Sequence, residues 1–163
     1  MKTYVMIPTY NERENIGNLI REILNLKISD LHVVVVDDNS PDGTSEIVKS
    51  LAKEHPEVEL LLRTTGRGRG SAGIAGFKYA LEHGADCVVE MDADFSHHPK
   101  YIPSFLEAIQ GADMVIGSRA VAGGKDVNRG IARRVITFLA GVYVKMLLGL
   151  KIKDVSSGYR CFK

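Results

Sequence analysis

The sequence predicts an α/β fold in which a mostly parallel sheet is flanked by helices. Short apolar runs rich in β-branched residues alternate along the chain with longer stretches whose apolar residues have helical spacing. Such alternation is typical of parallel strands joined by crossover helices. The 163 residues are 45% hydrophobic and 25% charged, which is enough for one domain with a sizeable core. Because no repeat or linker divides them, we expect a single domain over residues 1–163.

Strands and helices are expected in alternation from the first residues onward. The strands are expected at 4–7, 31–36, 58–62, 88–91 and 113–119. The helices are expected at about 11–24, 44–54, 74–81, 99–110 and 131–150. Pro8 stops the first strand, and the continuous β-branched run of the second strand is typical of a strand covered on both faces. Asn11 has the position of an N-cap with Glu14 three residues later, which predicts a capping box.

The fourth predicted strand ends in two aspartates separated by one small residue, Asp92-Ala93-Asp94. Carboxylates at the carboxyl end of a strand lie where open α/β sheets bind ligands. Mg²⁺ is typically held by one or two carboxylates together with substrate phosphates. Asp-x-Asp alone is a weak motif, and more often it marks only a polar transition from strand to loop. Its interpretation as a metal site therefore depends on the rest of the chain.

A second polar loop, residues 37–44, follows the second predicted strand. A tight turn that also caps the next helix accounts for Ser40, Asp42 and Thr44 as well as ligand binding does. Asp37 is a stronger candidate, because a carboxylate at this position can accept hydrogen bonds from a base or a ribose. Tyr10 is a further candidate, since its ring has no obvious place in a core beside the end of a strand.

Glycines and arginines indicate three further places where an anion could bind. The glycine-rich segment 65–73 leads into a helix and could approach an anion closely, although a flexible connection with two exposed arginines is an equal alternative. Arg119 ends the fifth predicted strand, and its guanidinium group suits bidentate phosphate recognition. Arg133 and Arg134 begin a long apolar helix, where positive charge opposes the helix dipole, so a ligand role is favoured for both.

The charge of the chain is divided unevenly between its two parts. Residues 1–118 carry 11 Lys and Arg against 18 Asp and Glu, whereas residues 119–163 carry 10 against 2. This division suggests a metal-bearing body and a surface that attracts phosphate or membrane, with a chance division as the alternative. A nucleic-acid partner is not expected. Two cysteines form no disulfide framework, and no apolar run reaches the ~20 residues of a spanning helix. We expect a cytosolic protein or one that lies on a membrane surface.

The predicted helix over residues 131–150 is apolar almost all round but too short to span a bilayer. It could lie in a membrane interface. It could equally be buried against a C-terminal portion that follows this sequence, a partner chain or a second copy.

Four blocks of the sequence, in order, resemble the family-2 inverting glycosyltransferases. Within that family the similarity is greatest to the polyprenyl-phosphate glycosyltransferases, the group of the dolichol-phosphate mannose synthases. The blocks are Ile7–Glu12, Val35–Thr44, Met91–Pro99 and Gly117–Arg119. Together with the terminal Ser157–Arg160 they cover nearly the whole chain, and their order makes the signal specific.

The resemblance implies a GT-A-like nucleotide-sugar-binding fold and a set of roles. The residues that would hold the guanosine are Pro8, Tyr10, Glu12, Val35 and Asp37. Asp92, Ala93 and Asp94 would hold the diphosphate-sugar and its Mg²⁺ or Mn²⁺, with Asp94 as the main metal ligand. Ser96 has the position at which some relatives present a Gln to the metal.

The resemblance also implies basic residues for the acceptor. Arg119, Arg133 and Arg134 would take the charge of the sugar phosphate and the lipid phosphate. Relatives continue beyond Lys163 with a helix and a basic loop that closes on the diphosphate, so this catalytic domain is expected to lack the C-terminal portion of the family.

The function expected from the resemblance is inverting transfer of mannose from GDP-mannose to dolichyl or another polyprenyl phosphate. The enzyme would be metal-dependent and peripheral on the cytoplasmic face of a membrane. A phosphate nucleophile with a second pKa near ~6 needs no strong general base, so His97 and His98 are expected only in a polar loop. The alternatives are a UDP-glucose-dependent glucosyltransferase, a non-catalytic nucleotide-sugar-binding module and an aspartyl phosphatase. The phosphatase is disfavoured because the acidic pair Asp37-Asp38 precedes the Asp92 loop.

Overall fold

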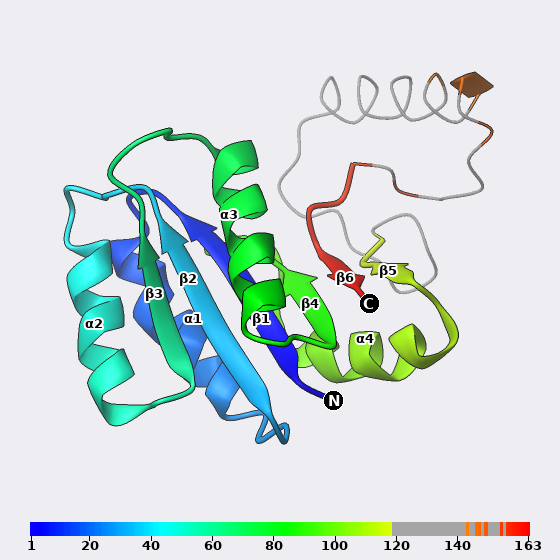
Figure 1. Cartoon of the computed structure of the whole chain (residues 1–163), viewed down its shortest axis with the longest axis horizontal. Coiled ribbons are helices and arrows are strands. Elements are labelled where there is room, and N and C mark those ends of the chain that lie inside the picture. The colour runs from blue at the N-terminus through cyan, green and yellow to red at the C-terminus, as the bar shows by residue number, and fades with distance from the viewer. Residues whose placement is uncertain (119–142, 144–145, 148, 150–153, 155) are drawn as a thin grey trace.

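A computed structural model of the chain describes residues 1–118, 143, 146, 147, 149, 154 and 156–163. In these residues the strands form one sheet in the order β3-β2-β1-β4-β6-β5 (Figure 1). The strands are β1 (Thr3–Thr9), β2 (Leu31–Asp37), β3 (Val58–Leu62), β4 (Cys87–Glu90), β5 (Met114–Ile116) and β6 (Arg160–Phe162). Strands β1 to β4 are mutually parallel, whereas β6 runs antiparallel to both β4 and β5.

The predicted fold class is confirmed, because the sheet is mostly parallel and helices cover both of its faces. The helices are α1 (Arg13–Leu24), α2 (Thr44–Glu54), α3 (Arg69–Glu82) and α4 (Ile102–Ala108), with short 3₁₀ turns at Pro99–Tyr101 and Ile109–Gly111. Helices α1, α2 and α4 contribute to the core on one face of the sheet, and α3 covers the other (Figure 1). Among the described residues no helix is long and apolar enough to cross a membrane.

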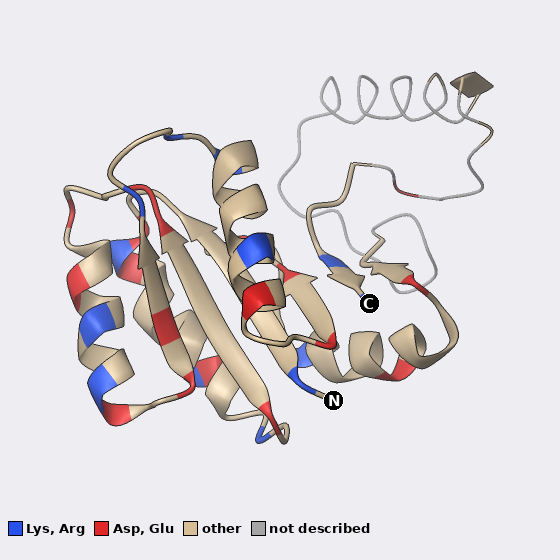
Figure 2. Ribbon diagram, viewed as in Figure 1, with Lys and Arg blue, Asp and Glu red and all other residues tan. Residues whose placement is uncertain are grey.

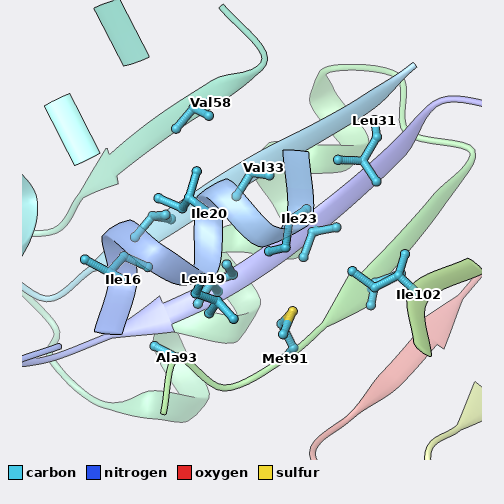
Figure 3. Packing of buried hydrophobic residues seen from close by; sticks show 14 of the residues in the cluster. Ile16, Leu19, Ile20, Ile23, Leu31, Val33, Val58, Met91, Ala93 and Ile102 are labelled. Carbon is cyan, nitrogen blue, oxygen red and sulfur yellow. The ribbon is translucent and has the colours of Figure 1, made fainter. Parts of the chain in front are cut away.

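Helix α1 supplies much of the larger core. Its buried residues follow helical spacing: Ile16, Leu19, Ile20 and Ile23 are fully shielded from solvent. Figure 3 shows them packed over the sheet beside Val33 of β2, with Met91 and Ile102 nearby. Because burial of one such side chain contributes roughly 1.5–3 kcal/mol, this face accounts for a large part of the stabilisation that holds β1 and β2 together.

The start of α1 differs from the predicted capping box. The N-cap is Glu12, no side chain of the helix itself caps it, and Asn11 has a left-handed φ of 60°. The amides of residues 11–13 donate instead to side chains of the loop after β2. Asn11 therefore does not act as the N-cap, because these long-range acceptors satisfy the exposed amides at the helix start.

Two features at the C-terminal side of the sheet were not predicted correctly. Strand β6 was not predicted, and it inserts between β4 and β5. The fifth predicted strand is shorter than expected, since β5 ends at Ile116. The predicted helix over 131–150 lies largely outside the described residues, although Tyr143, Met146 and Leu147 are described and are more than 60% exposed.

Helix α3 approaches the sheet closely because Gly76 has no side chain. A Cβ atom at this position would lie 2.4 Å from Cγ of Met6 and 2.9 Å from Cγ2 of Val36, which are fully buried. These separations are shorter than van der Waals contact, so any side chain at Gly76 would push the helix away from β1 and β2.

We predict that Gly76→Ala destabilises the protein although it improves helix propensity. Overpacking of a tight core costs about 1–3 kcal/mol, which exceeds the gain of roughly 0.5–1 kcal/mol from replacing a helical glycine. Gly70→Ala is the matched control, because it lies in the same helix and a Cβ there has nothing within 4 Å. Urea unfolding should give a lower midpoint for Gly76→Ala and an equal or higher midpoint for Gly70→Ala; equal gains for both would contradict the close approach.

Candidate functional site

The candidate site lies at the edge of the sheet where the parallel strands β1, β2 and β4 end. Figure 2 shows acidic residues at the ends of β2 and β4, and basic residues in the segment that leads into α3. Thr9 and Asp37 are paired across β1 and β2, so the two strands end level with each other. Three polar segments meet at this edge: the loop after β2, the segment 63–68 with the start of α3, and the turn after β4.

Asp37 is fully buried at the end of β2, and its carboxylate accepts three hydrogen bonds from protein donors. It accepts hydrogen bonds from Oγ1 of Thr9 at 2.9 Å and from the amide and Oγ of Ser40 at 2.9 and 2.6 Å. These bonds join the ends of β1 and β2 and hold the loop in a tight turn. Contact between Asp37 and a ligand was predicted from the sequence and stays a prediction.

The loop after β2 supplies acceptors to the start of α1. Asn11, Glu12 and Arg13 donate their amides to Oγ of Ser40, Oγ1 of Thr44 and Oδ2 of Asp42 at 2.9, 2.9 and 3.0 Å. Asp42 also accepts bonds from the amide and hydroxyl of Thr44. The alternative of a tight turn is therefore supported for Ser40, Asp42 and Thr44, but these side chains accept amides at the start of α1. Helix α2 has Gly43 as its N-cap without a side-chain cap, and of these three side chains only Asp42 accepts one of its amides.

Asp38 binds the glycine-rich segment, which is therefore held by the protein rather than being a flexible connection. Its carboxylate forms an ion pair with Arg63, at 2.7 Å from Nη1, and accepts the amide of Gly68 at 2.7 Å. Gly68 has a φ of 135°, which favours glycine, and it is the N-cap of α3. The segment therefore turns over Asp38, and α3 begins with Arg69 directed towards the end of β4.

Asp92 contacts a cationic side chain and a histidine. Oδ1 of Asp92 accepts Nε of Arg69 at 3.2 Å and is bonded to Nη2 of the same guanidinium group. The amide of Asp92 donates to Nδ1 of His97 at 2.9 Å. Glu90, which is nearly buried, lies 4.0 Å from Nη1 of Arg69, and burial raises the pKa of Glu90 although Arg69 and Arg160 oppose this effect. The carboxylates at the end of β4 thus already hold a positive charge.

Asp94 is exposed two residues further along the same turn. Its Oδ1 atom accepts the amide of Ser96 at 3.0 Å. Partial burial would raise the pKa of Asp94, but the bonds from Ser96 and the nearby His97 outweigh burial, so the pKa lies below its usual range. Ala93 between the two acids is buried, and Phe95 has a left-handed φ of 59°. The turn therefore keeps Asp94 ionised and accessible at neutral pH.

The residues of this turn fit a divalent cation that also binds a phosphate. No group of three or more His, Cys, Asp and Glu able to hold a metal was found in the part of the chain that the structure describes. Two carboxylates are sufficient for Mg²⁺ or Mn²⁺ when substrate phosphates supply further oxygens. The guanidinium group on Asp92 shows that this position accommodates positive charge.

The other predicted site residues differ in their exposure. Tyr10 is half exposed at the same edge, and the guanidinium carbon of Arg67 lies 5.9 Å from its ring centroid. Glu12 accepts the side-chain amide of Asn15 at 3.0 Å, and Pro8 is partly exposed. Val35 is fully buried in the core. Arg119, Arg133 and Arg134 lie outside the described residues.

The sequence did not single out Arg69, His97 or the segment 157–159 as parts of the site. The ring of His97 stacks on Tyr159 with 4.9 Å between centroids, and the hydroxyl of Tyr159 donates to the carbonyl of His98 at 3.0 Å. Burial raises the pKa of Tyr159, so its phenol is neutral. Gly158 lies against the same cluster, where a Cβ atom would be 3.5 Å from Oδ2 of Asp92. The C-terminal segment is thereby held beside Asp92.

Comparison with known proteins identifies one family over almost the whole chain. The model of the family described as Glycosyl transferase family 2 matches residues 4–163. The chain is 45% identical over its full length to an undecaprenyl-phosphate mannosyltransferase of Micrococcus luteus and spans 67% of that protein. It is 42% identical to a polyprenol monophosphomannose synthase of Mycolicibacterium smegmatis and 44% identical to a dolichol-phosphate mannosyltransferase of Pyrococcus furiosus, of which it spans 62% and 43%.

Solved structures of glycosyltransferases have the same fold. A mannosyltransferase of Pyrobaculum calidifontis in complex with GDP-Man and Mn²⁺ is 29% identical, with a TM-score of 0.57 over 72% of this chain and 35% of that one. Mannosyl-3-phosphoglycerate synthase of Rubrobacter xylanophilus has a TM-score of 0.73 over 100% of this chain and 54% of that one, at 19% identity. The predicted GT-A-like fold is confirmed by these neighbours.

We predict that Asp42 stabilises the fold in a pH-dependent way. Partial burial would raise the pKa of Asp42, but the bonds from Thr44 and the Arg13 amide outweigh it and leave the pKa below its usual range. A lowered folded-state pKa adds stability that is present above the unfolded pKa of ~3.9 and is lost as pH falls through the folded pKa. Asp42→Asn should therefore unfold at lower urea than the wild type at pH 6. The difference in urea midpoint between the variant and the wild type should become smaller below about pH 4. A difference at pH 3 equal to that at pH 6 would contradict the prediction.

Proposed function

Because the chain belongs to glycosyl transferase family 2, we propose that it transfers mannose from GDP-mannose to a polyprenyl phosphate with inversion at the anomeric carbon. The observation that carries the proposal is the pair Asp92 and Asp94 at the carboxyl end of β4, in a chain 42–45% identical to relatives named for polyprenyl or dolichyl phosphate and mannose. The aspartyl phosphatase alternative is set aside, since the family match is to glycosyltransferases.

The donor would bind along the edge formed by β1, β2 and β4. The exposed ring of Tyr10, with Arg67 over it, offers a surface on which a base can stack. Asp37 would act on the guanosine mainly by ordering the loop, since Thr9 and Ser40 already donate three hydrogen bonds to its buried carboxylate. Pro8, Glu12 and Val35 complete the set assigned to the nucleoside, with Val35 acting through the packing of the strand rather than through its buried side chain.

The diphosphate would bind at the turn after β4. Asp94 and Asp92, with Ser96 beside them, would hold a Mg²⁺ or Mn²⁺ ion, which when bound neutralises the charge of the departing nucleoside diphosphate. Asp94 is suited to this role because it is exposed and its pKa is lowered. The relative from Pyrobaculum calidifontis was solved with GDP-Man and Mn²⁺, which supports the same kind of donor here.

The acceptor would be the phosphate of a polyprenyl lipid. A phosphate monoester is largely ionised at neutral pH, so its oxygen can attack the anomeric carbon without a strong general base. The contacts of His97 agree with a reaction that needs no general base. Its Nδ1 atom accepts the amide of Asp92, and its ring stacks on Tyr159. Arg119, Arg133 and Arg134 are proposed to bind the phosphate groups, and the exposed side chains of Tyr143, Met146 and Leu147 suit a position at a membrane surface on its cytoplasmic side.

We predict that Asp94→Ala abolishes the metal-dependent part of GDP binding while the fold is retained. Calorimetry of the full chain with GDP should show binding that Mn²⁺ strengthens, and the substitution should weaken binding with Mn²⁺ by at least about tenfold, or roughly 1.4 kcal/mol. Asp113→Ala is the matched control, because Asp113 is an exposed aspartate that precedes β5 at the opposite edge of the sheet.

The same titrations separate the candidate donors. GDP and GDP-mannose should bind more tightly than UDP and UDP-glucose, whereas the reverse order would favour the glucosyltransferase alternative. An unchanged affinity for GDP with Mn²⁺ after Asp94→Ala would remove Asp94 from the metal site.

A further inference from the structure

Arg69 forms an ion pair with the aspartate assigned to the metal. Its Nε atom lies 3.2 Å from Oδ1 of Asp92, its Nη2 atom bonds the same oxygen, and its Nη1 atom lies 4.0 Å from Oε1 of Glu90. A divalent cation on Asp92 would bind either this oxygen or Oδ2 of the same carboxylate, and in both positions it would lie beside the guanidinium group. Two positive groups on one carboxylate group repel each other, so Arg69 and the cation compete for Asp92.

The position of Arg69 is set by the fold rather than by its own helix. Arg69 is the first residue of α3, so its positive charge opposes the helix dipole, and no acidic residue in the first turn offsets this repulsion. The residue is nevertheless directed at Asp92, because the preceding Gly68 is held on Asp38 through its amide. Gly158 covers the other side, where a Cβ atom would lie 2.9 Å from Nη2 of Arg69.

The guanidinium group also remains open to an incoming anion. The side chain of Arg69 is 56% exposed, whereas that of Asp92 is 32% exposed. A guanidinium group can form two parallel hydrogen bonds to a phosphate, as it can to a carboxylate. A diphosphate that reaches the end of β4 could therefore replace Asp92 as the partner of Arg69 by a small movement of one side chain.

We infer that Arg69 binds Asp92 when no donor is present and exchanges this carboxylate for the diphosphate of the donor, so that Asp92 becomes available to the divalent cation only together with the nucleotide. The inference rests on the proposed function and names a donor-binding residue beyond those assigned above. It predicts that the cation binds poorly to the free protein and well in the presence of a nucleoside diphosphate.

The test compares Arg69→Gln with the wild type in two binding measurements. The first is a titration of the full chain with Mn²⁺ alone, in which electron paramagnetic resonance measures the concentration of free Mn²⁺. The second is calorimetry with GDP in the absence of metal. Lys78→Gln is the matched control, since it removes the same charge from an exposed position further along α3. Arg69→Lys keeps the charge but loses the bidentate geometry.

Arg69→Gln should bind Mn²⁺ alone about three- to tenfold more tightly than the wild type, because the competing cation is gone. The same variant should bind GDP without metal about three- to tenfold more weakly. Arg69→Lys should resemble the wild type towards Mn²⁺, and Lys78→Gln should resemble it in both measurements. A side chain with a merely structural role would not make Mn²⁺ binding tighter.

Unchanged or weaker Mn²⁺ binding by Arg69→Gln would overturn the inference, as would unchanged binding of GDP. A wild-type chain that binds neither GDP nor UDP, with or without Mn²⁺, would instead overturn the proposed function. The Mn²⁺ titration would in that case still decide whether Arg69 competes for Asp92.

Discussion

The buried carboxylate of Asp37 is the contact on which the edge of the sheet depends. It ties Thr9 at the end of β1 to Ser40 in the loop after β2, and its burial means that these donors replace water entirely. A buried carboxylate that lost such partners would carry a large desolvation cost, so the turn is held in one conformation. The same loop then offers Ser40, Asp42 and Thr44 to the amides at the start of α1.

A second set of contacts passes from Asp38 to the end of β4. Asp38 holds Gly68, Gly68 sets the start of α3, and the first residue of α3 is the arginine that contacts Asp92. Neighbouring acids in the sequence therefore have different tasks. The carboxylates of Asp37 and Asp38 bind groups of the protein itself and thereby order the loops, whereas Asp94 is exposed and can bind a ligand.

Much of the fold could be predicted from the sequence, because β-branched runs and helical spacing are local signals. The four parallel strands and the helices that join them follow from those signals. Strand β6 could not be predicted in the same way, since three residues carry little pattern and its pairing with β4 joins residues far apart in the chain. The prediction of the α1 N-cap was wrong for a similar reason. The side chains that accept the amides at the start of α1 lie 29–32 residues away in the sequence.

The candidate site was predictable only in part. Asp92 and Asp94 follow from the rule that ligands bind at the carboxyl ends of parallel strands. The partners of Asp92 depend on a backbone φ of 135° at Gly68 and on the turn that returns His97 to Asp92, and neither leaves a periodic signal in the sequence. Arg69 therefore looked like one of several exposed arginines until its neighbours were known.

We propose that this edge of the sheet transfers mannose from a nucleotide sugar to a lipid phosphate. The most direct measurement incubates the full chain with GDP-mannose labelled in the sugar, Mn²⁺ and one of three acceptors: undecaprenyl phosphate, undecaprenol or 3-phosphoglycerate. We expect a labelled product that partitions into organic solvent only when undecaprenyl phosphate is the acceptor, because the attacking atom is a phosphate oxygen on a lipid. Labelled product from 3-phosphoglycerate, with none from undecaprenyl phosphate, would contradict the proposed transfer to a lipid phosphate.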